Sequence, residues 1–289
     1  MLTTVLDVVI AGLIQGGIYA LIAVGFNLQW GVTRVLNMSH GEFIMLGAFA
    51  AYFLYTVLGV SPLLSLVISA PFLFLLGFLL HRFLFRRLLK SAESTATFEI
   101  NSLLAAYGLM FILSNLAALS WGAQVKGYSY LAEPLSIAGA IFAQNRLTAL
   151  LLAVVICLLT YLFLKHTRLG KAIRATALDM NTAQLMGINV YQVLGICFGL
   201  GALLAGLAGA LVSMMFPIMA YMGLPYLVIA FIVVVLGGMG NIMGSLIGGF
   251  ILGLVGSVVT YVAPGLVMAA FYVIFALILL VKPKGILGK

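Results

Sequence analysis

The chain alternates between long apolar runs and short polar interruptions. Nine runs approach the length needed to cross a bilayer core of about 30 Å, which takes about 20 residues of helix. They cover residues 6–28, 41–59, 62–80, 99–121, 146–164, 191–215, 224–240, 245–262 and 264–281. None alternates apolar and polar residues with a period of two, and unpaired backbone groups are costly in lipid. The pattern therefore predicts an all-α, polytopic transmembrane bundle of about eight or nine spanning helices, some of them broken.

The composition agrees with this pattern and excludes a soluble protein. Of the 289 residues, 65% are hydrophobic and 7% are charged, and the mean hydropathy is +1.28. A soluble domain carries about 25% charged residues. The two longest interruptions, residues 122–145 and 165–190, are too short to fold as soluble domains. We therefore expect residues 1–289 to form a single transmembrane domain.

The basic residues predict the orientation. Eleven of the 14 lie in three clusters, at residues 82–90, 165–174 and 282–289. Nine crossings place all three on one face, which the positive-inside rule makes cytoplasmic, together with the C-terminus. The N-terminus and the loop 122–145 are then external. If residues 28–40 instead enter the bilayer and return, the side of the N-terminus changes. The net charge of +8 thus reflects topology, and it is not gathered into a groove for nucleic acid.

Few side chains offer catalytic or metal-binding chemistry. Cys157 and Cys197 lie inside apolar runs, and no cluster of His, Cys, Asp or Glu has the spacing of a metal site. No nucleophile is paired with a base, so neither catalysis nor a bound metal is expected. The glycine-rich segment 237–244 lacks the Gly-Lys-Ser/Thr ending of a phosphate loop. The segment is therefore not a nucleotide site, and any ATP used in transport must bind elsewhere.

The densest polar patch follows the first apolar run, at residues 30–42. Ser39 is placed to be the N-cap of a helix beginning at His40, with Glu42 at the third position of a capping box. One interpretation is a well-capped helix start. The other is that this helix N-terminus, with its free N–H groups, faces the carboxylate of an amino acid substrate. Asn37, Ser39, His40 and Glu42 would then lie on a translocation path.

Gly240, Gly244 and Gly248 recur every four residues and are predicted to line one face of a helix. Small residues at this spacing let helix backbones approach closely in lipid. The pattern fits packing inside one bundle, and it also fits a subunit interface.

A short echo pairs residues 41–44, Gly-Glu-Phe-Ile, with residues 248–251, Gly-Gly-Phe-Ile. Each follows a polar interruption between two apolar runs. Transporters are often built from repeats with broken helices in corresponding places. Four positions are too few to establish such a duplication.

The polar segment 168–189 predicts two short helices. Good helix formers precede Asp179, which favours a break and a new N-cap, and Gly187 is expected to be a C-cap. Its alanines, Ala183 among them, suit a shallow surface pressed into a partner. A solvated basic loop would explain charges such as Arg174 but not the alanines.

Five segments carry a resemblance to a known family. They are 16–25 (GGIYALIAVG), 37–48 (NMSHGEFIMLGA), 187–189 (GIN), 236–249 (LGGMGNIMGSLIGG) and 283–288 (PKGILG). Through them the sequence resembles, from end to end, the shorter permease subunit of branched-chain amino acid ABC importers, the LivH type. The resemblance is specific for the family and weak for the substrate, because related permeases carry urea, short amides and other amino acids.

The resemblance implies a permease in the cytoplasmic (inner) membrane of a bacterium. Its implied partners are a second permease, often a different one, two ATPase subunits that bind ATP and Mg, and an extracytoplasmic binding protein. It also implies that Arg174, Asp179, Ala183 and Gly187 belong to a coupling segment that docks on an ATPase. An ion-coupled carrier is the less favoured alternative, because only Glu42 and Glu99 lie close to helices. A membrane anchor without transport would not need a polar interruption inside the bundle.

Overall fold

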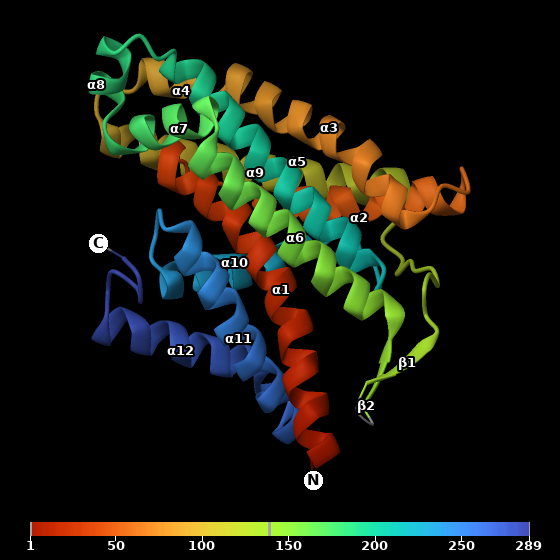
Figure 1. Cartoon of the computed structure of the whole chain (residues 1–289). Helices are drawn as coiled ribbons and strands as arrows, with labels where there is room; N and C mark the ends of the chain where they lie inside the picture. The colour runs from red at the N-terminus through yellow and green to blue at the C-terminus, as the bar shows by residue number, and fades with distance from the viewer. Residues whose placement is uncertain (1, 138–139, 289) are drawn as a thin grey trace.

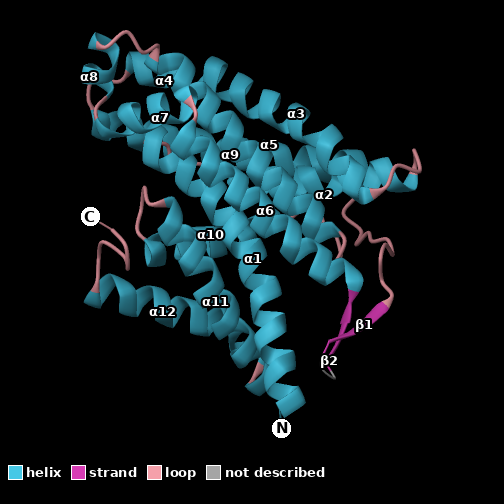
Figure 2. Ribbon diagram, viewed as in Figure 1, coloured by secondary structure: helices cyan, strands magenta, loops and turns pink. Residues whose placement is uncertain are grey.

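The computed structural model describes residues 2–137 and 140–288, and almost all of this chain is helical (Figure 2). The long helices are α1 (Leu2–Thr33), α2 (His40–Thr56), α3 (Pro62–Leu80), α5 (Thr95–Trp121), α6 (Gln144–His166), α9 (Val190–Ser213), α10 (Gly223–Gly237), α11 (Ile242–Val262) and α12 (Val267–Val281). The short ones are the π-helix η1 (His81–Phe85), α4 (Arg86–Ser91), α7 (Arg168–Leu178), α8 (Met180–Leu185) and the 3₁₀ turn η2 (Pro264–Leu266). Strands β1 (Pro134–Ile137) and β2 (Ala140–Ala143) form an antiparallel hairpin in which Pro134 pairs with Ala143.

Seven helices in the described part of the chain are long and apolar enough to cross a membrane. This is fewer than the eight or nine predicted, although all nine apolar runs are helical. The difference lies in α2 and α10, which have 17 and 15 residues. At 1.5 Å per residue they rise about 26 and 23 Å, less than the hydrocarbon core. A non-helical segment precedes each of them, residues 34–39 and 214–222.

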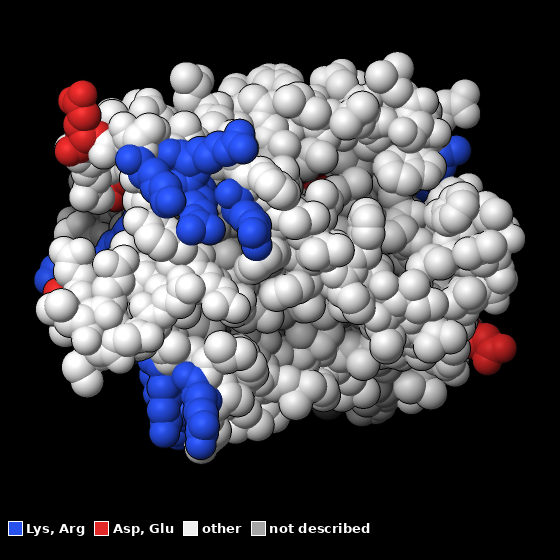
Figure 3. Space-filling model, turned by 90° about the horizontal axis from the view of Figure 1, so that it is seen from above, with Lys and Arg blue, Asp and Glu red and all other residues white. Residues whose placement is uncertain are grey.

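The three basic clusters lie at the same end of the bundle. Figure 1 shows α4, α7, α8 and the C-terminus together at the left, whereas the β-hairpin lies on the opposite side. Most of the blue surface in Figure 3 gathers at the left as well. We call this the basic end, and the end that carries residues 122–145 the far end.

The helices are arranged as two related units. In one unit α1 leads to the short α2 and then to α3, and in the other α9 leads to the short α10 and then to α11. α1 packs along α11, and α9 packs along α3, so the first helix of each unit contacts the third helix of the other (Figure 1). α2 ends at the far end, where Tyr55 donates to the Ser129 carbonyl (3.2 Å). α10 ends at the basic end, where Leu287 N–H donates to the Gly237 carbonyl (3.1 Å). The units therefore run in opposite directions, as in inverted-repeat transporters.

The sequence similarity between residues 41–44 and 248–251 does not correspond to this inverted repeat. A Cβ added at Gly41 would overlap the carbonyl of Gly223, so the first turn of α2 lies against the first turn of α10. Gly249 instead packs against Ala20 in the middle of α1. The equivalent positions are thus Gly41 and Gly223, whose neighbouring sequences are not alike.

Burial separates the central helices from the peripheral ones. In α9, 83% of the most apolar stretch is buried. Small residues on all sides of this helix let neighbouring helices approach closely. In the last span, Pro264–Val281, only 6% of the most apolar stretch is buried, and Phe271 is the one buried residue of α12. α12 therefore lies at the periphery of the bundle, and α9 at its centre.

Candidate functional site

The segment between α1 and α2 turns back into the bundle. Arg34 adopts a left-handed conformation (φ 56°) directly after α1 ends. The Thr33 hydroxyl donates to the Gln29 carbonyl (2.8 Å) and accepts from the Val35 amide (3.3 Å). α2 then begins with His40 beside Ile22, almost three turns back along α1. α2 therefore starts inside the protein rather than at its surface.

Gln29 is the centre of the polar network that holds this turn. Its Nε2 donates to the Phe198 carbonyl on α9 (2.9 Å), and its Oε1 accepts from Asn37 Nδ2 (3.0 Å). His40 Nδ1 lies 3.2 Å from the same oxygen, and His40 Nε2 lies 3.2 Å from the Ile22 carbonyl. Gln29, Asn37 and His40 are each 0% exposed. Buried amides with this many partners rigidify the segments that they join.

The predicted capping box is wrong. Ser39 does occupy the N-cap position of α2, but its side chain makes no cap bond. Its hydroxyl and its amide both bond to Asn37 Oδ1, at 2.6 and 3.1 Å. The hydroxyl therefore closes the turn that precedes the helix. The Glu42 side chain does not bond back to the Ser39 amide, because Asn37 already occupies it.

Glu42 lies where the N-termini of α2 and α10 meet. The residue is 2% exposed, and its Oε2 has no hydrogen-bond partner in the described chain. A Cβ added at Gly223, the first residue of α10, would lie 2.7 Å from Glu42 Oε1. Both helix N-termini carry partial positive charge, so their meeting point suits an anionic group. The Glu42 carboxylate is that group in this structure.

The four residues predicted on a translocation path thus fall into two sets. Asn37, Ser39 and His40 are fully enclosed, and they bond to α1 and to one another. Glu42 faces the junction of two half-helices from different units. The sequence interpretation missed Gln29, although it precedes Thr33 by one turn near the end of a mostly apolar helix. That spacing is the signal that could have revealed it.

The segment 168–189 forms the two short helices that were predicted. Asp179 separates them and caps α8: its carboxylate accepts from the Asn181 amide (2.8 Å) and from the Thr182 hydroxyl (2.7 Å). The Thr182 hydroxyl, followed by the backbone amides, lowers the pKa of Asp179. Gly187 ends α8 with φ 80°. Glycine adopts that conformation without strain.

The sequence predicts that Ala183 contacts a partner, and this choice of residue is wrong. Ala183 is 4% exposed and belongs to the chain's own core, among residues of α1, α6, α7 and α9. The Arg174 guanidinium donates to the Leu164 carbonyl near the end of α6. The most exposed large apolar side chains of this segment are instead Leu178, Leu185 and Met186, which are 89%, 88% and 79% exposed. Large apolar side chains exposed at a polar end are typical of an interaction surface.

The three glycines predicted to share a helix face do not all lie on a helix. Gly240 precedes α11, in the turn with φ 83°, where its amide donates to Asn27 Oδ1 (2.6 Å). A turn of this kind ends the helical repeat, so the four-residue spacing does not extend to it. A Cβ at Gly244 would overlap the carbonyl of Gly237, and one at Gly248 would lie 2.9 Å from the Val233 carbonyl. Those two glycines bring α11 against α10 within one chain.

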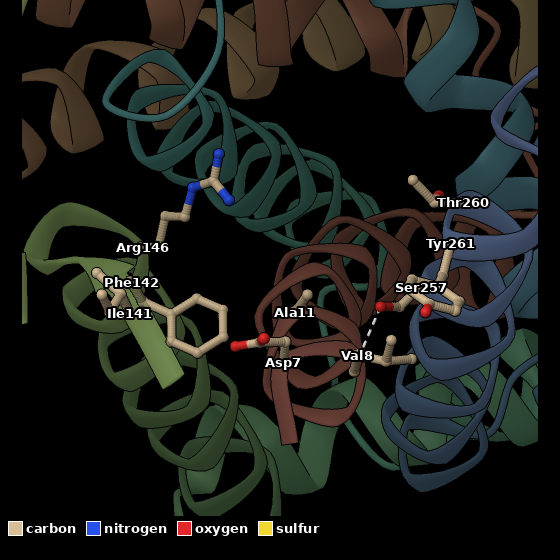
Figure 4. A pocket seen from close by; sticks show the side chains of 9 residues that line it. All are labelled: Asp7, Val8, Ala11, Ile141, Phe142, Arg146, Ser257, Thr260 and Tyr261. Atoms are coloured by element: carbon tan, nitrogen blue, oxygen red, sulfur yellow. Dashed lines mark hydrogen bonds between the residues drawn. The ribbon is translucent and has the colours of Figure 1, made fainter. Parts of the chain in front are cut away.

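A cavity of about 490 Å³ opens at the far end, between α1, the β-hairpin and the end of α11. Figure 4 shows Asp7 on α1 and Arg146 at the start of α6, coming from different elements around it. Phe142 and Val8 contribute apolar walls, and the Ser257 hydroxyl donates to the Val8 carbonyl (2.6 Å). The cavity presents a carboxylate, a guanidinium and apolar surface, a combination that suits a small zwitterion.

The potential metal-ligating side chains of the described residues do not cluster. Those residues contain no group of three His, Cys, Asp or Glu side chains that could hold a metal ion. Cys157 and Cys197 are both free and buried. The polar groups of the site are instead amides, an imidazole and a carboxylate at helix ends.

Two half-helices that meet inside a multi-pass bundle define the class of the molecule, a membrane transport protein. The chain belongs to the branched-chain amino acid transport family, because the model described as "Branched-chain amino acid transport system / permease component" matches residues 8–282. It is 29% identical to the high-affinity branched-chain amino acid transport system permease protein LivH of Salmonella typhimurium, over 96% of this chain and 94% of that protein. It is 28% identical to BraD of Pseudomonas aeruginosa, over 98% and 96%.

Among solved structures, PsaBC from Streptococcus pneumoniae in complex with Fab has a TM-score of 0.49 and 14% identity to this chain. The match covers 96% of this chain and 91% of that one.

Proposed function

We propose that the chain is half of the membrane pore of an ATP-driven importer for branched-chain or related hydrophobic amino acids. The observation that carries this proposal is the family match across residues 8–282, which includes both half-helices. The relatives LivH and BraD bear the names of branched-chain amino acid permeases. Urea, short amides or another small solute remain the alternative substrates within the same kind of system.

Glu42 is the residue that we place on the translocation path. It is the only one of the four predicted path residues that faces both units, and its Oε2 is free to take a partner. The substrate carries an ammonium and a carboxylate, which suit a side-chain carboxylate and two helix N-termini respectively. Asn37, Ser39 and His40 hold the start of α2 against α1, so that Glu42 keeps its position.

The basic end is proposed to be cytoplasmic, because positive charge is retained on that side of the membrane. The N-terminus and the far end are then extracytoplasmic, and the chain lies in the cytoplasmic membrane of a bacterium. An extracytoplasmic binding protein would deliver substrate at the far end, near the cavity between Asp7 and Arg146. A second permease, expected to differ from this chain in sequence, would complete the pore.

Two ATPase subunits, which bind ATP and Mg, are proposed to dock at the basic end. Leu178, Leu185 and Met186 are the contact residues that the structure favours. Asp179 and Gly187 shape the segment that presents them, and Ala183 anchors it to the core. Movement of the ATPases can reach the pore only through surfaces that they touch.

The test is uptake into vesicles that contain the chain with its partner subunits. We expect leucine to enter only when ATP and the binding protein are present, and an ion gradient to drive no uptake. Leu185→Ser should uncouple ATP hydrolysis from uptake, whereas Leu58→Ser, the same change at an exposed site between α2 and α3, should not. Uptake driven by an ion gradient without ATP would refute the proposal. Uptake of urea but not of leucine would select the alternative substrate.

A further inference from the structure

A second cavity, of about 310 Å³, lies at the basic end between η1 and the start of α9. His81, Arg82 and Arg86 line one side, and Asn189, Tyr191 and Gln192 line the other. None of the described residues that line it is acidic. Arg86 packs over the Tyr191 ring, with its guanidinium 5.0 Å from the ring centroid. That contact fixes one of the two guanidinium groups at the cavity wall.

His81 is the first sign that the cavity is built for a ligand. Its side chain is 1% exposed, yet within the described chain neither ring nitrogen has a hydrogen-bond partner. The imidazole on the cavity wall is therefore free to bond to a ligand there. Its ring packs against Phe198, at 5.9 Å between centroids, which leaves the cavity as the direction open to its polar edge.

The local backbone supplies the other two signs. The Arg86 amide donates to the His81 carbonyl, the five-residue spacing of a π turn, and such turns often accompany functional sites. Across the cavity α9 begins at Val190, and its 24 residues direct the positive end of the helix toward the same space. Asn189 caps this helix by accepting from the Gln192 amide (3.2 Å). The amides of Val190 and Tyr191 bond to no acceptor in the described chain.

We propose that this cavity binds a phosphate group, presented by the headgroup of an anionic phospholipid. Two guanidinium groups and a helix N-terminus offer donors and positive charge, and the imidazole can add one more donor, which matches a phosphate rather than a cation. Phe78 lines the cavity on the side from which α3 arrives. A headgroup can thus sit among the arginines while its acyl chains follow the apolar surface of α3. Basic pockets between helices at the cytoplasmic side are suited to lipid headgroups.

The positive-inside rule explains basic residues at this end of the chain, but it does not explain their arrangement. Arg87, which directly follows Arg86 in the chain, is exposed and does not line the cavity. A rule based on topology treats Arg82, Arg86 and Arg87 alike. A built site distinguishes them, and this difference makes the proposal testable.

The experiment measures lipid retention by the purified full chain in detergent, with native mass spectrometry and thermal melting. The probes are phosphatidylglycerol, phosphatidylcholine and inorganic phosphate. Wild type should retain phosphatidylglycerol in preference to phosphatidylcholine and melt at a higher temperature with it. Arg82→Gln should weaken phosphatidylglycerol binding about tenfold, the loss expected for one charge-assisted hydrogen bond. Arg87→Gln, with the same change of charge, should weaken it less than about twofold.

Arg82 is exposed, so its substitution should leave folding intact, and His81→Gln provides a second variant that keeps a donor in the cavity. Inorganic phosphate that displaces the lipid would support the site and show that it takes phosphate from either source. Phosphate without effect on a retained lipid would assign the site to the headgroup alone. Equal losses in Arg82→Gln and Arg87→Gln, or equal retention of the two lipids by wild type, would overturn the proposal.

Discussion

The segments that lead into α2 and α10 bring the two half-helices to the same point by different chemistry. Residues 34–39 are held by side chains: Asn37, Ser39 and the adjacent His40 bond to one another and to α1. Residues 214–222 are held by their backbone. Ile218 exchanges two hydrogen bonds with Lys126 of the far-end loop, at 2.8 and 2.9 Å, and the Met214 carbonyl accepts from Asn145 (2.7 Å).

Because of this difference, the two lead-in segments, residues 34–39 and 214–222, are stabilised by different parts of the chain. The first is nearly self-contained, since its partners lie within 18 residues in the chain apart from the Phe198 carbonyl. The second depends on loop and helix residues about 70 to 90 positions away. Substitutions should therefore separate a half-helix that supports its own start from one whose start is supported by the far end.

The contact shared by both half-helices should give the largest effect. Gly41→Ala places a Cβ onto the backbone of Gly223, and neither backbone can rotate away. We expect a loss of about 3 kcal/mol of stability or more, the upper end for overpacked sites, because the added atom meets backbone. Gly108→Ala is the matched control, because nothing lies within 4 Å of its added Cβ. The measurement is thermal melting in detergent, and equal melting temperatures for the two variants would show that the half-helices do not touch.

The second prediction compares substitutions of the side chains that stabilise the two lead-in segments. His40→Ala removes two contacts from a network that is 0% exposed and should cost about 1–3 kcal/mol. Asn145→Ala removes one bond and should cost about 1 kcal/mol, because its Oδ1 already lacks a partner. Limited proteolysis should show that each variant loosens only its own lead-in segment. Cleavage of residues 214–222 in the His40→Ala variant would mean that the two starts are not independent.

A smaller change in stability is expected at the junction itself. Glu42→Gln keeps the shape of the side chain and removes a buried carboxylate whose Oε2 has no partner among the described residues. We expect a change in stability within about 0.5 kcal/mol, or a gain, since no hydrogen bond to Oε2 is lost. Amino acid uptake should nevertheless fall several-fold. Normal uptake by a well-folded variant would remove Glu42 from the path.

The spans and the two short helices of 168–189 could be predicted because their signals are local. Apolar length, a cap at Asp179 and a glycine at position 187 need no knowledge of neighbours. The broken start of α10 has a local signal in Pro217, but Ile218 and Ala220 beside it are apolar and buried, so the segment resembles the end of an apolar run. The face of α8 that is buried also depends on distant helices, which is why Ala183 was assigned to the surface. Gln29 was missed because its partners Phe198 and Asn37 meet it only in the fold.

The smallest effect compares a cap that titrates with one that does not. The folded pKa of Asp179 is lowered, first by the Thr182 hydroxyl, so its stabilisation of α8 is present above the unfolded pKa of about 3.9. It is lost as the pH falls through the lower folded pKa, because protonation removes the charge that the donors favour. The amides of Ala183 and Gln184 should therefore open more readily to hydrogen exchange at pH 3 than at pH 7, after correction for the intrinsic rate. Asp179→Asn retains an N-cap acceptor without a titrating group and should abolish this pH dependence. The start of α3, which Ser61 caps and whose first turn holds no acidic residue, should show none in either protein. An unchanged pH dependence in the Asp179→Asn variant would place the titrating group elsewhere.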